Sequence, residues 1–500
     1  MQRCGSAVGD GLEIPVPCIL PSEILMEKRQ RVNSVSEARR AIQSFLPGLD
    51  RSPVPKTGGT RRNPAGANAA FLNGLAAAAF AQLLLLLPSG ARAGDWYVDG
   101  RGESSPFASL PQAPWQSFAE IDWSRVGPGD TIHIVGDACS PGYRETLVVG
   151  ASGSSTAPLV ISGMSQPGRG DPVIDGENQR ASGVVLRNRD NVIVRRLAIR
   201  NHAAAGISIQ GARSGVVVER NSIFSGDPGG GNARGIDARE NRGEDALIVR
   251  ENYFSTPDSS GAQTDGIYSM DNDGVLFERN RIVISNGDTS GHSDGFQSFQ
   301  DKGIRVYGNW FEQANTAATD NHGVWMSNGR EGGNIDFRNN VIFVRHLAQD
   351  SAVTHYRSSG WTERAGVSIT QNTILGGGRA LNLADSPQAE VHGNIIVPAE
   401  GGTPVVLLGQ APPAGSIDRN LIWVSGRIVG REEAQSFSWD EWQQRGYDTH
   451  GMNLTLPSVP RTMQDLQAAA ALLPGSYGAP GALLPPAHAD PPAGPCATAP

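Results

Sequence analysis

An asparagine recurs at a nearly constant interval through the middle of this chain. Each one stands near the end of a short run rich in Val, Ile and Phe. The column comprises Asn221, Asn252, Asn280, Asn309, Asn340, Asn372, Asn394 and Asn420. Successive spacings are 31, 28, 29, 31, 32, 22 and 26 residues. A unit of roughly 20–45 residues that returns in this way is one repeat of a solenoid, stacked on its neighbours.

Short apolar runs between turn residues make each repeat a coil of strands. The chain has 62 Gly and 33 Pro, which interrupt the β-branched runs every few residues. A second run in each repeat covers 206–210, 235–239, 266–270, 295–299, 323–327 and 380–383. Stacked parallel strands bury inward-facing apolar side chains in one core. The asparagines can hydrogen-bond along the stack or lie in the left-handed backbone region at a bend. The sequence therefore predicts an all-β solenoid with an asparagine ladder.

An apolar stretch near the N-terminus has the features of a secretory signal. Residues 67–87 carry no charge, follow two arginines, and precede the Ala-Arg-Ala tripeptide at 91–93, a pattern typical of signal-peptide cleavage. The same run is long enough to cross a bilayer, so an uncleaved anchor is the alternative. We expect residues 1–93 to be an N-terminal extension with a signal peptide. The mature protein is then secreted or periplasmic, with no membrane segment.

The repeat pattern ends before the C-terminus. Residues 436–451 suggest a short helix that caps the open end of the stack, and the last residues are rich in Pro, Ala and Gly. We expect a β-helix domain over 94–460 and a loose tail over 461–500, in a protein that is monomeric.

Charge argues against a nucleic-acid partner. Without residues 1–93, the 42 basic and 50 acidic side chains fall to 31 and 44, a net charge of −13. Such a chain does not attract a polyanion through bulk charge. A polyanionic ligand requires local arginines or a bound cation.

The layout resembles the right-handed parallel β-helix proteins of the pectate-lyase-like superfamily. The segments that carry the resemblance are DWYVDGRGESSPFASLPQAPWQSFAEID near the mature N-terminus, YRETLVVGASGSSTAPLVISG with the PVIDG that follows it, and SWDEWQQRGYD near the end. The resemblance implies a single-stranded right-handed parallel β-helix over most of residues 94–460. It leaves the activity open, because the superfamily includes lyases, hydrolases, epimerases and proteins of no known activity.

Three polar residues occupy one position in successive coils. Asp265, Asp294 and His322 each precede the glycine of a second run, so they should stack about 4.8 Å apart. Two carboxylates at that spacing share a proton or bind a cation. Asp237 lies near the same position in the preceding coil, so Asp237, Asp265 and Asp294 are candidate Ca²⁺ ligands. An aspartate ladder that satisfies turn N–H groups is the structural alternative.

The segment His292-Ser-Asp294-Gly-Phe-Gln297 resembles a His-x-Asp-x-apolar-Gln motif of bacterial β-helix proteins related to mannuronan epimerases. In those epimerases the matched motif is Asp-Pro-His-Asp, to which only His292 and Asp294 correspond, with altered spacing. Histidine can take up a proton near neutral pH, and aspartate can orient it. We therefore take His292, Asp294 and His322 as candidate catalytic residues, with Gln297 as a substrate contact.

Further candidate site residues are basic or aromatic. Lys302 is the single lysine after the signal, and some β-helix lyases use lysine or arginine as the base that removes a uronate proton. The remaining candidates contact substrate: aromatic side chains stack on sugar rings, and arginines bind carboxylates. These candidates are Tyr268, Trp325, Arg330, His355 and Arg357.

We expect a polysaccharide lyase that cleaves an anionic, uronate-containing polysaccharide by β-elimination. Elimination begins with loss of the proton at carbon 5, for which the substrate carboxylate must be neutralised by Asp-bound Ca²⁺ or by arginine. A uronate epimerase begins with the same step, so the same residues would serve it. An aspartate pair would also serve a glycoside hydrolase. A non-catalytic glycan-binding or envelope protein would have the same stack of coils without depending on these residues.

Overall fold

The computed structural model describes a β-helix and leaves gaps between several of its strands. The chain divides into two units, 1–84 and 85–500, and all described residues lie in the second. These residues are 93–102, 107, 110, 113–136, 142–165, 171–224, 233–256, 264–285, 293–313, 322–327, 334–344, 351–356, 366–384, 386–399, 404–423 and 428–454.

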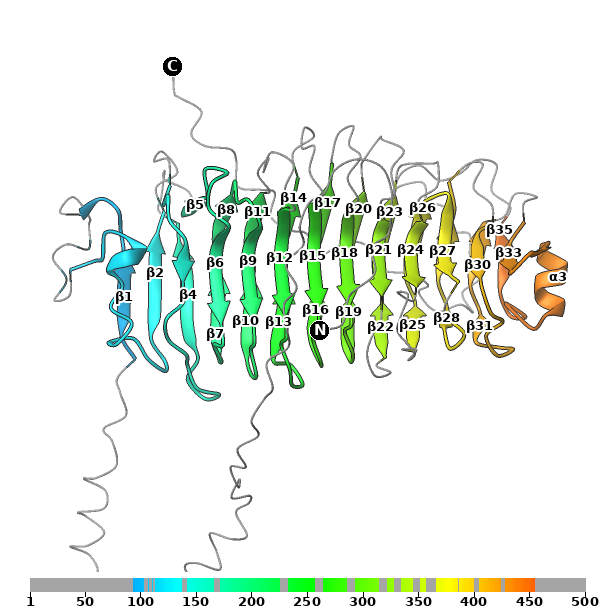
Figure 1. The fold of residues 1–500 in the computed structure, drawn as a ribbon, viewed down its shortest axis with the longest axis horizontal. Coiled ribbons are helices and arrows are strands. Elements are labelled where there is room, and N and C mark those ends of the chain that lie inside the picture. The colour runs from blue at the N-terminus through cyan, green and yellow to red at the C-terminus, as the bar shows by residue number, and fades with distance from the viewer. Residues whose placement is uncertain are drawn as a thin grey trace, which may run out of the picture. The chain divides into compact units, whose positions relative to one another are not determined.

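Three sheets run along the stack of coils, and each complete coil contributes one strand to each sheet (Figure 1). Sheet A has 12 strands, in the order β1 (Asp95–Val98), β2 (Thr131–Val135), β4 (Leu159–Met164), β7 (Val192–Arg195), β10 (Val216–Glu219), β13 (Leu247–Arg250), β16 (Leu276–Glu278), β19 (Ile304–Tyr307), β22 (Ile335–Arg338), β25 (Val367–Thr370), β28 (Glu390–His392) and β31 (Ile417–Asp418).

Sheet B has 11 strands: β5 (Val173–Asp175), β8 (Ala198–Arg200), β11 (Ser222–Phe224), β14 (Tyr253–Ser255), β17 (Arg281–Ile284), β20 (Trp310–Gln313), β23 (Val341–Val344), β26 (Thr373–Gly376), β29 (Ile395–Val397), β32 (Leu421–Trp423) and β35 (Met452–Leu454).

Sheet C has 12 strands: β3 (Leu147–Val148), β6 (Ser182–Arg187), β9 (Ala205–Gln210), β12 (Ala233–Arg239), β15 (Thr264–Met270), β18 (Asp294–Phe299), β21 (His322–Ser327), β24 (Ser351–Tyr356), β27 (Arg379–Leu383), β30 (Val406–Leu408), β33 (Gly430–Glu432) and β34 (Gln435–Phe437). Strands β33 and β34 pair antiparallel, whereas the strands that follow one another from coil to coil pair parallel.

The predicted parallel β-helix with an asparagine ladder is confirmed. The core runs through the inside of the coils, where the inward side chains of sheet A, such as Val249, Phe277 and Val306, are fully buried. Each run that carries a ladder asparagine forms two strands, one in sheet A and one in sheet B, with the asparagine at the turn between them. The second run predicted in each coil is a sheet C strand.

The ladder has a direction and ends on a carboxylate. Each asparagine donates from Nδ2 to Oδ1 of the next: Asn280 to Asn309 at 2.9 Å and Asn309 to Asn340 at 3.0 Å are typical. The last of them, Asn420, donates to Oδ1 of Asp448 at 2.9 Å. An aspartate suits this end because an ionised carboxylate only accepts hydrogen bonds. Unlike an asparagine, it has no N–H group that would need a further acceptor.

The ladder asparagines do not themselves adopt the left-handed conformation that is open to asparagine at a bend. The residue before each of them does, as Arg220, Glu251, Arg279 and Gln371 show with φ between 51° and 56°. This residue turns the chain from sheet A to sheet B, and the ladder asparagine then satisfies backbone groups of the turn.

A second, shorter ladder crosses the turn between sheets C and A. Asn241 donates from Nδ2 to Oδ1 of Asn272 at 2.9 Å, and the backbone N–H of Asn272 donates to Asp301 at 2.7 Å. Asp301 is almost fully buried, and burial raises its pKa to about 7 despite hydrogen bonds from Ser269, Ser298 and Asn272. This ladder therefore also ends on an aspartate.

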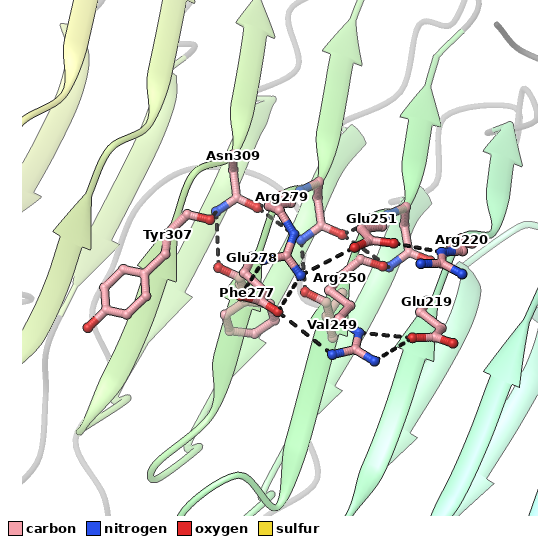
Figure 2. A network of polar contacts seen from close by, with 12 residues as sticks. Glu219, Arg220, Val249, Arg250, Glu251, Phe277, Glu278, Arg279, Tyr307 and Asn309 are labelled. Atoms are coloured by element: carbon pink, nitrogen blue, oxygen red, sulfur yellow. Dashed lines mark hydrogen bonds and ion pairs between the residues drawn. The ribbon is translucent and has the colours of Figure 1, made fainter. Parts of the chain in front are cut away.

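Charged side chains cover part of sheet A on the outside, beside the long ladder (Figure 2). Arg250 lies 2.7 Å from Glu219 on one neighbouring strand and 3.9 Å from Glu278 on the other. In the turn position beside them, Glu251 lies 2.6 Å from Arg220 and 3.2 Å from Arg279. Opposite charges thus alternate from coil to coil and neutralise one another on the surface.

In the part of the chain that the structure describes, two short helices flank the coils, the 3₁₀ helix η2 (Phe118–Glu120) and the α-helix α3 (Trp439–Gln444). Helix α3 begins with a capping box between Ser438 and Glu441. Its Trp442 is fully buried against Phe437 and Tyr447 at the C-terminal end of the core, as predicted for a cap. Within the described residues no helix combines the length and apolarity needed to cross a membrane. The apolar run 67–87 lies outside them.

Candidate active site

Polar side chains line up where the strands of sheet C begin. Strand pairing places Arg234 beside Asp265, Asp294 beside His322, and Ser351 beside Arg379. The pairs Ile267–Phe296 and Val324–Val353 align the intervening strands, so the six residues form one column across six coils. We call this the entry column: Arg234, Asp265, Asp294, His322, Ser351 and Arg379.

A glycine after each of the central positions turns the entry column away from the core. A Cβ atom on Gly266 would lie 2.3 Å from Cγ2 of Ile282 and 2.5 Å from the carbonyl oxygen of Gly295. The glycine therefore faces the core, as does Ile267 after it. Two consecutive residues that face the core interrupt the usual alternation of side chains between the two faces of the strand, and they leave Asp265 on the outer side. The same arrangement recurs at Gly295 and Gly323.

Asp294 is the centre of the hydrogen-bond network in this column. Its Oδ1 lies 3.1 Å from Nδ1 of His322 and accepts the backbone N–H of His322 at 3.1 Å. Its Oδ2 accepts from Nε2 of Gln297 at 2.9 Å. An ionised Asp294 thus selects the His322 tautomer with the proton on Nδ1 and makes Nε2 the nitrogen that can take up a proton. Asp294 is fully buried, whereas the His322 side chain is 6% exposed.

Asp265 forms a buried acid pair with Asp294. Its Oδ1 accepts the backbone N–H of Asp294 at 3.3 Å, and its Oδ2 lies 3.7 Å from Nε of Arg234. Burial and then the charge of Asp294 raise the pKa of Asp265 well above its ordinary value. The pair therefore favours one proton on Asp265 and one negative charge on Asp294, facing His322.

Aromatic side chains lie further along the outer face of sheet C. Tyr268, Gln297 and Trp325 are paired in register on successive strands, three residues into each from the entry column. The Arg234 guanidinium lies 3.8 Å from the Tyr268 ring centre, and Tyr268 is only 9% exposed. Trp325 is partly exposed and lies 4.6 Å from Phe299, ring centre to ring centre. Trp325 and Phe299 thus form an apolar surface on this face, whereas arginine covers Tyr268.

The donor set does not fit the predicted calcium ion. Asp237 is held by Arg239, whose Nε and Nη2 lie 2.6 and 2.9 Å from its two oxygens. It pairs with Tyr268, three positions from the entry column. Arg234 stands beside Asp265, where a cation would be needed. In the part of the chain that the structure describes, no three metal-ligating side chains come together.

Two predicted site residues lie away from the entry column. Lys302 follows β18 at the far end from Asp294, and its ammonium group lies 3.2 Å from Asp273. His355 pairs in register with the core residue Met326, so it faces inward, where Nδ1 contacts Ser386. Burial lowers the pKa of His355 to about 4. Lys302 thus lies in the turn after the strand and apart from Asp294, whereas the inward-facing His355 contradicts the predicted substrate contact.

Three more predicted residues, His292, Arg330 and Arg357, lie outside the described residues. Arg234 was not among the predicted site residues, although it stands before Gly235 just as Asp265 stands before Gly266. Ser351 and Arg379 were not predicted either, because alanine replaces the glycine after each of them.

A family model described as a right-handed beta helix region matches residues 182–359. No curated protein matches the sequence. Among solved structures, a rhamnogalacturonan lyase is 14% identical with a TM-score of 0.42, and the alignment covers 78% of this chain and 100% of the lyase. A pectate lyase is 16% identical with a TM-score of 0.41, covering 75% and 90%. An alginate lyase from Paenibacillus sp. str. FPU-7 is 16% identical with a TM-score of 0.31, covering 49% and 89%. The chain is a right-handed parallel β-helix protein, a fold that many activities share.

Proposed function

We propose that this right-handed β-helix protein is a secreted polysaccharide lyase that cleaves a uronate-containing polysaccharide by β-elimination. The observation that carries the proposal is the His322 imidazole, fixed by Asp294 at 3.1 Å on the outer side of sheet C. Trp325 and Phe299 on the same face offer a surface for sugar rings. A titratable base beside an aromatic surface suits proton removal from a bound sugar.

His322 supplies the proton transfers of the reaction. Nε2 takes the proton from carbon 5, and the electron pair of that C–H bond forms the double bond between carbons 4 and 5. The bond from carbon 4 to the leaving oxygen breaks, and the imidazolium returns the proton to that oxygen. Asp294 stabilises the imidazolium between the two transfers because its carboxylate faces Nδ1.

Arg379 supplies the charge that neutralises the substrate carboxylate. It lies two coils beyond His322 in the entry column, about 10 Å along the stack, and the short side chain of Ser351 lies between them. Arg379 is partly exposed and has no ion pair with another described residue. A uronate bound over Ser351 therefore presents its carboxylate to Arg379 and its ring to His322. This assignment uses arginine in place of Ca²⁺, in keeping with the donor set.

A glycoside hydrolase is the second candidate, favoured by the Asp265–Asp294 pair. One carboxyl is disposed to hold a proton and the other a charge, and their adjacent-coil spacing of about 5 Å is near that of a retaining enzyme. Both carboxyls are fully buried, however, whereas the substrate must contact them. This burial ranks the hydrolase below the lyase. Epimerisation shares the first proton transfer and differs in where the proton returns.

The deciding experiment incubates the purified protein with a panel of uronate polymers. Ultraviolet absorbance reports an unsaturated sugar end, and a reducing-end assay reports hydrolysis. We expect absorbance to rise on at least one polymer and the rise to vanish in His322→Ala. Release of reducing ends without absorbance would establish the hydrolase instead. If the polymer binds but neither signal appears, an epimerase and a binding protein remain as candidates. Exchange of the proton at carbon 5 with solvent distinguishes them, because only the epimerase catalyses it.

A further inference from the structure

A groove of about 710 Å³ lies on the outside of sheet A, near the C-terminal end of the stack. It is separate from the entry column, which lies in sheet C. Its lining comprises Arg338, Thr370, Gln371, His392, Gly393, Arg419 and His450.

The groove exists because short side chains replace long ones beside the asparagine ladder. Arg338, Thr370 and His392 pair in register at the ends of three sheet A strands. In the turn position beside them, Gly393 adopts the left-handed conformation, with φ of 64°. In the coils of β10, β13 and β16 the same positions hold the interlocked arginines and glutamates of Figure 2. Thr370 and Gly393 therefore leave a hollow between the flanking Arg338 and Arg419.

Arg419, beside the groove, is less well neutralised than the arginines of the earlier coils. Arg419 is 71% exposed, and its nearest acidic partner, Asp418, lies 3.9 Å away. Asp418 is engaged by His450, through Nδ1 at 2.9 Å and the backbone N–H at 2.9 Å. Arg338 lies 3.0 Å from Asp336 and is 47% exposed. Two guanidinium groups and two imidazoles thus line the hollow. Asp336 pairs with Arg338, whereas the carboxylate nearest Arg419 is already engaged by His450.

We propose that this groove binds a segment of an acidic polysaccharide, with uronate carboxylates held by Arg338 and Arg419. Guanidinium groups bind carboxylates through paired hydrogen bonds. Thr370, Gln371 and the two imidazoles supply donors and acceptors for sugar hydroxyls. The site is non-catalytic and serves to hold the polymer. The polymer class rests on the proposed function, whereas binding at the groove does not require turnover.

A polysaccharide fits the groove better than a nucleic acid does. The whole chain carries a formal net charge of −8, which opposes close binding of a densely charged phosphate backbone. A uronate chain has one charge per sugar and hydroxyls between them, which matches a few arginines among neutral polar groups. Among the described residues that line the groove there is no Trp, Tyr or Phe on which bases would stack.

The test measures binding of fluorescent galacturonate and mannuronate hexamers to the His322→Ala protein, in which turnover is blocked. The double variant Arg338→Ala/Arg419→Ala is compared with Arg196→Ala in the same background. Arg196 is a matched control because it is exposed and occupies the same left-handed turn position as Arg419, with φ of 57° against 59°. Circular dichroism checks that every variant is folded.

We expect the double variant to lose about tenfold or more in affinity for at least one hexamer, because guanidinium–carboxylate hydrogen bonds are charge-assisted. We expect Arg196→Ala to bind as its parent does, and a neutral maltohexaose not to bind. Equal affinity of double variant and parent, no binding of either hexamer, or tighter binding of single-stranded DNA would each overturn the proposal. If the wild-type protein gives no elimination but the double variant still loses binding, the proposed lyase activity is wrong and the proposed binding at the groove is supported.

Discussion

Nδ1 of His322 and Oδ1 of Asp294 lie 3.1 Å apart across two neighbouring strands of sheet C, and the same oxygen accepts the backbone N–H of His322. One carboxylate oxygen thus fixes both the backbone and the ring of the histidine. Gln297 holds the other oxygen, so Asp294 has little freedom to rotate. In the proposed reaction this arrangement orients the base before substrate arrives, which favours proton transfer.

His322→Ala should lower kcat for elimination by about 10²–10⁴-fold, because general acid–base catalysis contributes about that much. The matched control is His133→Ala, which removes the histidine of another Asp–His pair, 2.8 Å from Asp95 in sheet A. Steady-state kinetics on the best uronate polymer measures both. Equal loss in the two variants would indicate a general effect on the fold and contradict the assignment.

Asp294→Asn should lower kcat strongly and leave KM little changed. The amide is nearly the same size but cannot stabilise the imidazolium with a negative charge, and it permits the other His322 tautomer. Removing a buried charge beside Asp265 should leave the midpoint of thermal unfolding unchanged or raise it. A fall in that midpoint together with lost activity would show that Asp294 acts mainly in stability.

Chelator should leave activity unchanged. Arg234 and Arg239 stand where a cation bound by Asp237 and Asp265 would need to be. The measurement compares initial rates of elimination after dialysis against EDTA, with and without added Ca²⁺. Activity lost to chelator and restored by Ca²⁺ would reinstate calcium and require ligands outside the described residues.

Asn309→Ala should lower the free energy of unfolding by about 2–4 kcal/mol. It removes the acceptor of two hydrogen bonds from Asn280 and the donor to Asn340 and to the carbonyl of Phe277, all within the buried ladder. Urea unfolding followed by circular dichroism measures the change. Asn382→Ala is the control, because Asn382 accepts a single long bond of 3.4 Å on the outer face of sheet C. Similar losses in both variants would contradict a special role for the ladder.

Asp301→Asn should remove a dependence of stability on pH. The folded-state pKa of Asp301 is raised to about 7, above that of the unfolded chain. Between pH 4 and 7 the folded state therefore binds more protons, so its stability falls as pH rises. Over this range Asp301 should lower the free energy of unfolding of the wild-type protein by on the order of a few kcal/mol. The Asp301→Asn variant should lack this contribution. Urea unfolding at pH 4.5 and pH 8 tests it, and parallel curves for the two proteins would refute it.

Sequence periodicity predicted the fold because parallel coils must match their neighbours in length. The repeated asparagine located the turn between sheets A and B, and the glycine after Asp265, Asp294 and His322 located the start of the sheet C strands. These features are local and recur, so they can be read without knowing any contact. The same reasoning aligned Asp294 with His322, which strand pairing confirms.

The tertiary structure decided which polar residues share an environment. His322 and His355 lie in successive coils, but His355 pairs in register with the core residue Met326 and therefore faces the core. Lys302 is close to Asp294 in sequence but lies beyond the other end of β18. Asp237 forms an ion pair with Arg239, although the sequence predicted that it binds Ca²⁺.

These differences share one physical cause. A shift along a strand changes the face on which a side chain lies, and the length of a strand separates its ends by about 3.3 Å per residue. The spacing of the repeats indicates which coil contains a residue. Only the register between coils determines which side chains that residue contacts. The sequence by itself therefore determined the solenoid and its ladder, whereas register, burial and the arginines around each carboxylate determined the site.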